Sequence, residues 1–238
     1  MPITFHILDA LSRDQVDTVT RETEEEEEIE RTYEEDNEKG YKSKSSMPQR
    51  RSLVIHLFGM TAEGETLRCD VSGFRPYLYV KVDDRADELR FKDMLKSSGK
   101  EVPASLEVEK VKRKELYGFT ADQDSSFMKL SVNSLKDFRT LKLILLNDYQ
   151  EPIFRTSKTS APLPVYESGL DPLLRFFHLC DIAPCGWVSV DEVEDKVDED
   201  TGVRVLICVW TDIEAEVKPP KPTAPFKTLF WDIECFSE

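Results

Sequence analysis

The sequence predicts an α+β fold in which strands predominate. Between residues 53 and 213, many short runs rich in Val, Ile, Leu, Phe and Tyr are separated by Gly, Pro and acidic turns, a pattern typical of strands. Within residues 76–146, two stretches place apolar residues at helical spacing instead. No run approaches the roughly 20 apolar residues of a membrane span, and 238 residues are enough to bury a sizeable core.

The amino-terminal part predicts a strand, a charged loop and a hairpin. The run ITFHILD (3–9) alternates as a first strand. Residues 12–51 lack apolar periodicity, so we expect a long, mostly disordered insertion there. The runs LVIHLFGM and TLRCDV, at 53–60 and 66–71, flank a turn at Gly64 and predict a hairpin.

The central part predicts a β-α-β-β-α unit. Strands are expected at 76–82, 106–119 and 126–132, with a helix at 85–99 after the first of them. A second helix follows Ser134, which together with Asp137 forms an S-x-x-D capping pattern. Its expected apolar face consists of Leu135, Phe138, Leu141 and Leu145. The topology is close to a ferredoxin-like or RNA-recognition-motif-like unit, which serves many unrelated functions.

The carboxy-terminal part predicts a connector, a helix and three strands. Residues 150–164 are rich in Pro, Ser and Thr, and the next segment, GLDPLLRFFHLC, begins a helix with Asp171 as N-cap and Pro172 at the first position. The strands are expected in GWVSV (186–190), VRVLICVWTDI (203–213) and FKTLFWDIE (226–234). The proline cluster 218–225 separates the last two, so we expect one domain over 1–225 and a new one from 226.

The net charge of −15 is concentrated in two runs. Residues 22–38 contain eleven acidic side chains and one Arg, and residues 191–200 contain seven and one Lys. Without them the chain is close to neutral, so the overall charge does not exclude a nucleic-acid partner. We expect both acidic runs to be solvated or disordered insertions.

The five cysteines predict reduced thiols. They are scattered through apolar stretches, they form no C-x-x-C pair, and the chain has three histidines. The pattern does not favour a disulfide framework or a zinc site. The first fifteen residues, MPITFHILDALSRDQ, lack the basic and apolar regions of a secretory signal, so we expect an intracellular protein.

Two carboxylates lie close together on the last expected strand. Asp232 and Glu234 are two positions apart, so on a strand their side chains point to the same face. Such a pair can share hard divalent ions, as in two-metal phosphoryl hydrolysis. The alternative is a half-exposed strand with a solvated acidic edge, and Asp212-Ile213-Glu214 shows that the pattern also occurs elsewhere in this chain.

Four ordered motifs resemble those of family B DNA polymerases. TLFWDIECFS resembles the first motif of their 3′–5′ exonuclease domain. Upstream, GFRPYLYVKV, KRKELYGF and VYESGLDPLLRFFHLCDIAPCGWVSV resemble segments of their amino-terminal domain in the same order. The resemblance covers residues 50–238 and is to the delta-type enzymes of large DNA viruses and eukaryotic replicases.

This resemblance implies a replicative DNA-directed DNA polymerase, a nucleotidyltransferase with a proofreading exonuclease of ribonuclease H-like fold. The chain would contain its amino-terminal domain and the first exonuclease strand, and by itself would be inactive. In the parent, Asp232 would bind both of two Mg²⁺ or Mn²⁺ ions, and Glu234 would bind one and orient the attacking water. The implied partners are primer-template DNA, the remaining polymerase domains and a sliding clamp or accessory subunits, with no membrane. The implied place is the nucleus, or a cytoplasmic replication site for a viral enzyme.

Further residues are candidates for nucleic-acid contacts. Tyr77 and Tyr79 alternate on one strand, where aromatic side chains can stack on bases or pack in a core. The basic run of Lys110, Lys112, Arg113 and Lys114 can meet phosphates or form a solvated strand face. For Tyr166, Arg175 and Trp187, which match the family's segment, we expect packing roles.

Two other functions remain open on the residues alone. One is a stand-alone nucleic-acid-binding or protein-interaction module without catalysis. The other is an unrelated nuclease of ribonuclease H-like fold. The sequence downstream of residue 238 would discriminate among them, because a polymerase must carry two more exonuclease motifs and an aspartate-containing palm motif.

Overall fold

The computed structural model describes residues 2–16, 50–82, 85–97, 99–115, 124–156, 158–191 and 193–226. The chain divides into two compact units. The first comprises residues 1–11, 55–71 and 176–238, and the second comprises residues 12–54 and 72–175. Asp232 and Glu234 lie outside the described residues, as do the acidic run 22–38 and most of the expected strand 226–234.

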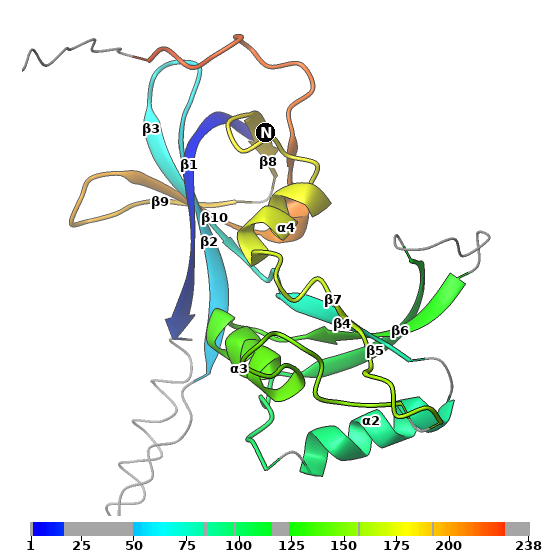
Figure 1. Ribbon diagram of the computed structural model, residues 1–238. Helices are drawn as coiled ribbons and strands as arrows, with labels where there is room; N and C mark the ends of the chain where they lie inside the picture. Colours follow the sequence, from blue (N-terminus) through cyan, green and yellow to red (C-terminus); the bar gives the residue numbers. More distant parts are fainter. Residues whose placement is uncertain are drawn as a thin grey trace, which may run out of the picture. The chain divides into compact units, whose positions relative to one another are not determined.

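The first unit is built around a seven-stranded sheet in the order β11-β8-β1-β2-β3-β10-β9 (Figure 1). The strands of this sheet are β1 (Ile3–Val16), β2 (Arg51–Met60), β3 (Thr66–Ser72), β8 (Trp187–Val190), β9 (Glu194–Val197), β10 (Arg204–Val209) and β11 (Ile213–Ala215). Of these strands, residues 12–16, 51–54 and 72 are counted with the second unit. The expected hairpin of β2 and β3 is confirmed, with His56 opposite Asp70 and Gly64 in the turn at a φ of 93°. The sheet also joins strands that are distant in sequence, since β1 is next to β8 and β3 is next to β10.

Close packing in the first unit requires a glycine. Phe5 and Ile7 are fully buried, as are Ile55 and Leu57. A Cβ atom at Gly59 would overlap the Phe5 ring and approach the His6 carbonyl oxygen to 2.8 Å. The absence of a side chain at Gly59 thus lets β1 and β2 pack at their actual separation.

The expectation for the acidic run 191–200 is wrong in part. Most of its described residues are exposed, but Glu194–Val197 form β9, which pairs antiparallel with β10. Arg204 of β10 offsets the charge, because its Nε and Nη2 donate to the Asp195 carboxylate at 3.0 and 2.6 Å. Asp198 closes the turn by accepting the Thr201 N–H at 2.9 Å. Backbone pairing at a sheet edge tolerates charged side chains, so composition alone missed this strand.

Two strand boundaries also differ from the sequence-based expectation. β1 continues to Val16, five residues into the expected 12–51 loop. The expected single strand 203–213 is interrupted by the 3₁₀ turn η1 (Trp210–Asp212), after which β11 begins. The helix α4 (Pro172–Leu179) begins as predicted, since Asp171 Oδ1 accepts the Leu173 N–H at 2.8 Å.

The cysteines of the described residues are free thiols. The sulfur atoms of Cys69 and Cys208, both buried, lie 3.6 Å apart on β3 and β10. The hydrogen bond with Cys208, with burial, raises the pKa of Cys69 far above its ordinary value, and burial raises the pKa of Cys180 to about 11. Cys185 is exposed, although it follows the apolar stretch Ile182–Pro184 in the sequence.

The second unit contains a four-stranded sheet, all of whose neighbours are antiparallel, in the order β5-β6-β4-β7. Its elements are β4 (Tyr77–Lys81), α2 (Arg85–Ser97), β5 (Glu107–Lys114), β6 (Asp124–Ser131), α3 (Leu135–Leu145) and β7 (Val165–Tyr166). Figure 1 shows α2 and α3 on the same side of this sheet. The core between them includes Leu78, Phe91, Met128, Leu130 and Leu141.

The start of α3 is fixed by two side chains. Ser134 is the N-cap, and its Oγ accepts the Asp137 N–H at 3.0 Å, as the capping pattern predicts. Asp14 of β1 accepts the N–H groups of Leu135 and Lys136 at 2.6 and 2.9 Å. These contacts satisfy donors that the first turn of a helix leaves unpaired. Leu135 is only partly buried, so the buried face of α3 consists of Phe138, Leu141, Ile144 and Leu145.

Taken together, the mixed α+β fold with predominant strands is confirmed. Among the described helices, none is long and apolar enough to cross a membrane.

We expect the two faces of α3 to respond differently to truncation. Leu141 is fully buried, so Leu141→Ala should lower the free energy of unfolding by about 2–5 kcal/mol. Leu143 is 62% exposed, so Leu143→Ala should change it by less than about 0.5 kcal/mol. Urea denaturation of the two variants measures both values. Equal losses would show that the helix does not cover the sheet as described.

Candidate nucleic-acid interface

The structure describes the predicted nucleic-acid contacts but not the predicted metal ligands. Asp232 and Glu234 lie beyond residue 226, the last described position. In the described part of the chain, no group of three or more His, Cys, Asp or Glu side chains is arranged to hold a metal ion. The candidate site that can be built from geometry is therefore on the four-stranded sheet of the second unit.

One face of this sheet is not covered by α2 and α3. Leu78 and Val80 of β4 point into the helix-covered core, so Tyr77, Tyr79 and Lys81 point to the other side, since side chains alternate along a strand. We call this other side the open face. The pairings Tyr79↔Lys129, Lys81↔Phe127, Arg113↔Ser125 and Tyr79↔Tyr166 add residues of β6, β5 and β7 to it.

The aromatic side chains of the open face contact one another edge to face. The ring centroids of Tyr77 and Tyr79 are 5.4 Å apart, and those of Tyr79 and Phe127 are 6.2 Å apart. Phe127 also lies 5.5 Å from Tyr166. Phe127 is buried by its neighbours, whereas Tyr77, Tyr79 and Tyr166 remain partly exposed. The aromatic rings thus pack against one another, and three tyrosines remain accessible to solvent.

Two cations lie over the ring of Tyr77. The Arg175 guanidinium carbon is 3.9 Å from the ring centroid, and Lys129 Nζ is 4.5 Å from it. Arg175 is buried and is held by Glu167, whose Oε2 lies 2.7 Å from its Nη1. Tyr77 therefore already has cation–π partners. A base can stack on it only by displacing one of them, whereas no cation of the described residues lies over the ring of Tyr79.

The rim of the open face contains a connected polar network around Glu115. Its carboxylate accepts Lys81 Nζ at 2.7 Å, Ser125 Oγ at 2.6 Å and the Tyr166 hydroxyl at 3.3 Å. The hydrogen bond from Lys81 holds the pKa of Glu115 below its usual value, with further support from Ser125. Burial, with the neighbouring Tyr77, raises the pKa of Tyr79, so its hydroxyl stays protonated near neutral pH.

The six predicted nucleic-acid residues divide between the two faces. Tyr77, Tyr79 and Arg113 lie together on the open face. Lys110 and Lys112 lie opposite Met128 and Ser126, and Lys114 lies opposite Asp124, so all three point to the helix-covered side. Lys110 is also paired with Glu88 of α2 at 3.0 Å. The basic run on β5 is thus not one continuous surface with the tyrosines.

Sequence reasoning missed the cations that accompany the tyrosines. Lys129 follows from the alternation of SFMKLSV once Met128 and Leu130 are assigned to the core. Arg175 belongs to α4, and no local pattern links it to Tyr77, which is nearly 100 positions earlier. That contact arises from the tertiary fold and has no signal in a single sequence.

Comparisons with known proteins find DNA polymerases. Residues 163–238 match the family model described as "DNA polymerase family B, exonuclease domain". A DNA polymerase of Pyramimonas orientalis virus is 30% identical over 192 residues, which cover 77% of this chain and 15% of the relative. The DNA polymerase delta catalytic subunit of Drosophila melanogaster is 24% identical over 204 residues, covering 76% of this chain and 18% of the relative.

A solved structure supports the same architecture. The family B DNA polymerase from the hyperthermophilic archaeon Pyrobaculum calidifontis superposes with a TM-score of 0.53 at 19% identity, over 92% of this chain and 21% of that one. At this identity the likeness concerns the fold alone. The chain spans less than one fifth of the length of the two curated relatives above.

The lowered pKa of Glu115 predicts an acid-sensitive contribution to stability. Because its pKa is lower in the folded state, the contribution is present above the unfolded-state pKa of about 4.3 and is lost as the pH falls through the folded-state pKa. Glu115→Gln should therefore lose less thermal stability than the wild type between neutral pH and about pH 3. Lys81→Met removes the main hydrogen-bond donor to Glu115, so it should also lose less thermal stability than the wild type between neutral pH and about pH 3. Calorimetry across this pH range measures it, and parallel curves for all three proteins would contradict the assignment.

Proposed function

We propose, since the chain belongs to the family B DNA polymerases, that it forms the amino-terminal region of a replicative DNA polymerase that proofreads its product. The observation that carries this proposal is the match of residues 163–238 to the exonuclease family together with relatives named DNA polymerase. In this proposal residues 1–225 form the amino-terminal domain, and the exonuclease domain begins at residue 226. The delta-type resemblance favours a replicative enzyme of a virus or of a eukaryotic cell.

We further propose that Asp232 and Glu234 take part in excision. They lie within the matched segment and supply hard oxygen ligands, which suit Mg²⁺ or Mn²⁺. A divalent ion bound there would activate water and stabilise the charge on the scissile phosphate. In this proposal Asp232 would bind both of two divalent ions, and Glu234 would bind one of them and help to orient the attacking water.

The open face is proposed as a contact for single-stranded template. Its support is the combination of partly exposed tyrosines with Lys129 and Arg113 on one sheet face, since aromatic rings and cations together bind single strands without sequence preference. The strand order β5-β6-β4-β7 with both helices on one face supports the proposal of an RNA-recognition-motif-like unit, a fold whose aromatic sheet residues stack on bases. DNA, the remaining polymerase domains and a clamp or accessory subunit are the proposed partners.

The second candidate function is a nucleic-acid-binding module that acts without catalysis. The open face favours it, because that face can be described without reference to Asp232 or Glu234. Both functions predict single-strand binding, and they differ in whether this acidic pair is needed for excision by the full-length protein.

The first test therefore concerns the full-length polymerase that contains this chain. Asp232→Ala combined with Glu234→Ala should reduce 3′–5′ excision at least about 100-fold, because metal stabilisation contributes several kcal/mol to such reactions. Primer extension should persist, since polymerisation uses a separate set of carboxylates. Gel assays with labelled primer-template measure both activities.

The 238-residue chain by itself serves as the control for this test. It should neither extend nor excise a primer, because it carries two of the proposed ligands and no polymerase palm. Full excision by the double variant would remove the pair from the mechanism. Robust nuclease activity of the isolated chain would favour an unrelated nuclease.

The second test concerns the open face. Lys129→Glu and Tyr79→Ala should each weaken binding of a fluorescent oligothymidylate by roughly 5- to 100-fold at low salt, since a stacked base contributes about 1–3 kcal/mol. Lys112→Glu is the matched control, because Lys112 lies on the neighbouring strand and points to the other side. Fluorescence anisotropy measures the affinities, and equal losses in all three variants would indicate non-specific charge attraction.

A further inference from the structure

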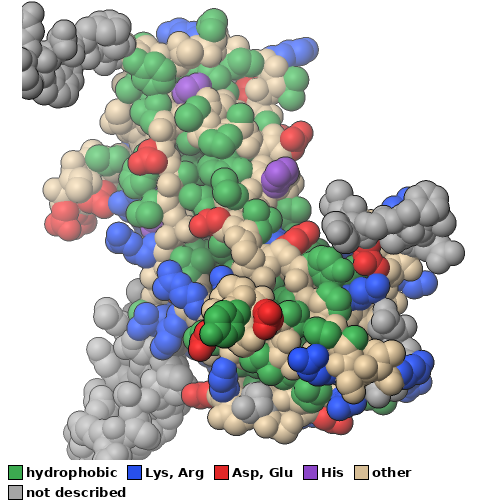
Figure 2. Space-filling view, in the orientation of Figure 1, with side chains coloured by type: hydrophobic (Ala, Val, Ile, Leu, Met, Phe, Trp, Pro, Cys, Tyr) green, Lys and Arg blue, Asp and Glu red, His purple; other side chains and the backbone are tan. Residues whose placement is uncertain are grey.

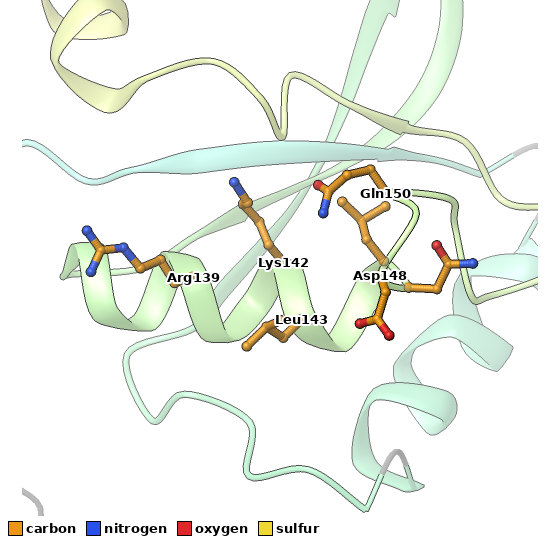
Figure 3. Close-up of a pocket in the computed structure, with 7 residues that line it drawn as sticks. Arg139, Lys142, Leu143, Asp148 and Gln150 are labelled. Carbon is orange, nitrogen blue, oxygen red and sulfur yellow. The ribbon is translucent and has the colours of Figure 1, made fainter.

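A pocket outside the open face lies along the second half of α3. It has a volume of about 330 Å³ and is formed by α3 and the turn that follows it. Its lining residues are Arg139, Lys142, Leu143, Leu146, Asn147, Asp148 and Gln150. We call it the α3 pocket. Figure 3 shows Lys142 and Gln150 on one side of the helix axis, with Leu143 and Asp148 on the other.

The α3 pocket combines exposed apolar surface with free positive charge. Leu143 is 62% exposed, and Tyr149 at the tip of the following turn is 85% exposed. Arg139 and Lys142 make no ion pair with an acidic side chain that the structure describes, and Lys142 Nζ instead lies 5.8 Å from the Phe138 ring centroid. An apolar hollow with unpaired cations fits a ligand that is acidic and carries an apolar group.

The positive charge continues toward the start of α3. Lys136 lies one turn before Arg139, and Arg13 and Arg51 are exposed at the ends of β1 and β2. Figure 2 shows Lys and Arg side chains gathered beside the first turns of α3 and these strand ends. The ligand therefore meets a row of cations and not a single charge.

The lining favours a peptide over a nucleic acid. Leu143 and Leu146 offer apolar contact at the pocket, which an apolar side chain of a peptide can use and a phosphate cannot. A peptide can direct its carboxylates to Arg139 and Lys142 and place an apolar side chain against Leu143.

We propose that the α3 pocket binds the glutamate-rich segment 22–38 of this same chain. The segment has a net charge of −10 and carries two apolar side chains, Ile29 and Tyr33, four positions apart. Its chemistry is thus complementary to the pocket in both respects. The contact is electrostatic with an apolar anchor, and it would shield a basic surface from other polyanions.

The connection to the described residues permits this contact. Asp14 of β1 binds the first two N–H groups of α3, so the chain leaves β1 beside the start of this helix. The eight steps from Asp14 to Glu22 can span about 26–29 Å, and α3 with its 11 residues is about 16 Å long. Tethering raises the effective concentration of such a segment to about the millimolar range. A weak intrinsic affinity is then sufficient for occupancy.

Carbodiimide cross-linking of the full 238-residue chain tests the proposal, because the reagent joins a lysine amine to a carboxylate only where the two are in contact. Mass spectrometry of the monomer should show Lys142, or Lys136, joined to a glutamate of 22–38. The yield should fall at least about fivefold at 0.5 M salt, where the Debye length is roughly 4 Å. Arg139→Glu and Leu143→Asn should each reduce it severalfold while leaving Lys142 available.

Arg90→Glu is the matched control, since Arg90 is an exposed cation on the neighbouring helix α2 and should leave the yield unchanged. Circular dichroism verifies that the variants are folded. Links from Lys142 only to described acids such as Asp148 would overturn the proposal. Links confined to dimers would assign the segment's partner to a second copy and would overturn it also. Loss of oligothymidylate binding in Arg139→Glu, without a change in cross-linking, would assign the pocket to nucleic acid instead.

Discussion

The alternation of side chains along β4 and β6 is the constraint on which the second unit depends. Leu78, Val80, Met128 and Leu130 must face α2 and α3 to form the core, so the residues between them must face away. The aromatic layer of Tyr77, Tyr79 and Phe127 is a consequence of that register. A shift by one residue would bury the tyrosines and expose the leucines, so the position of the open face is as strongly fixed as the core itself.

Local patterns in the sequence were sufficient for most elements of the fold. Ser134 and Asp171 begin helices as predicted, because a side-chain cap is a short-range interaction that neighbouring residues encode. The strand β9 was missed because Asp195, one of its acidic residues, is paired with Arg204 of the partner strand, which composition over a ten-residue window does not include. Turn η1 interrupts an apolar run that has no Gly or Pro to signal it.

The candidate site was predicted less completely than the fold, for a related reason. Tyr79 and Arg113 share the open face, whereas Lys110, Lys112 and Lys114, which belong to the same basic run as Arg113, point to the other side. The cation–π contact between Arg175 and Tyr77 joins segments nearly 100 positions apart and has no local signal. For Asp232 and Glu234 the prediction rests on their motif, since both lie outside the described residues.

The contacts of Tyr77 also bear on how the open face can work. Arg175 is buried and is held by Glu167, so displacing it from the ring would leave a desolvated charge without its aromatic partner. Lys129 is partly exposed and has a flexible side chain, so it can turn toward a phosphate at a lower cost. A strand that binds here would then stack on Tyr79 and take its phosphate contact from Lys129, while Arg175 and Tyr77 stay together. In this proposed mode Tyr77 would position the site and Tyr79 would contact the ligand, although the two residues are equivalent in the sequence pattern.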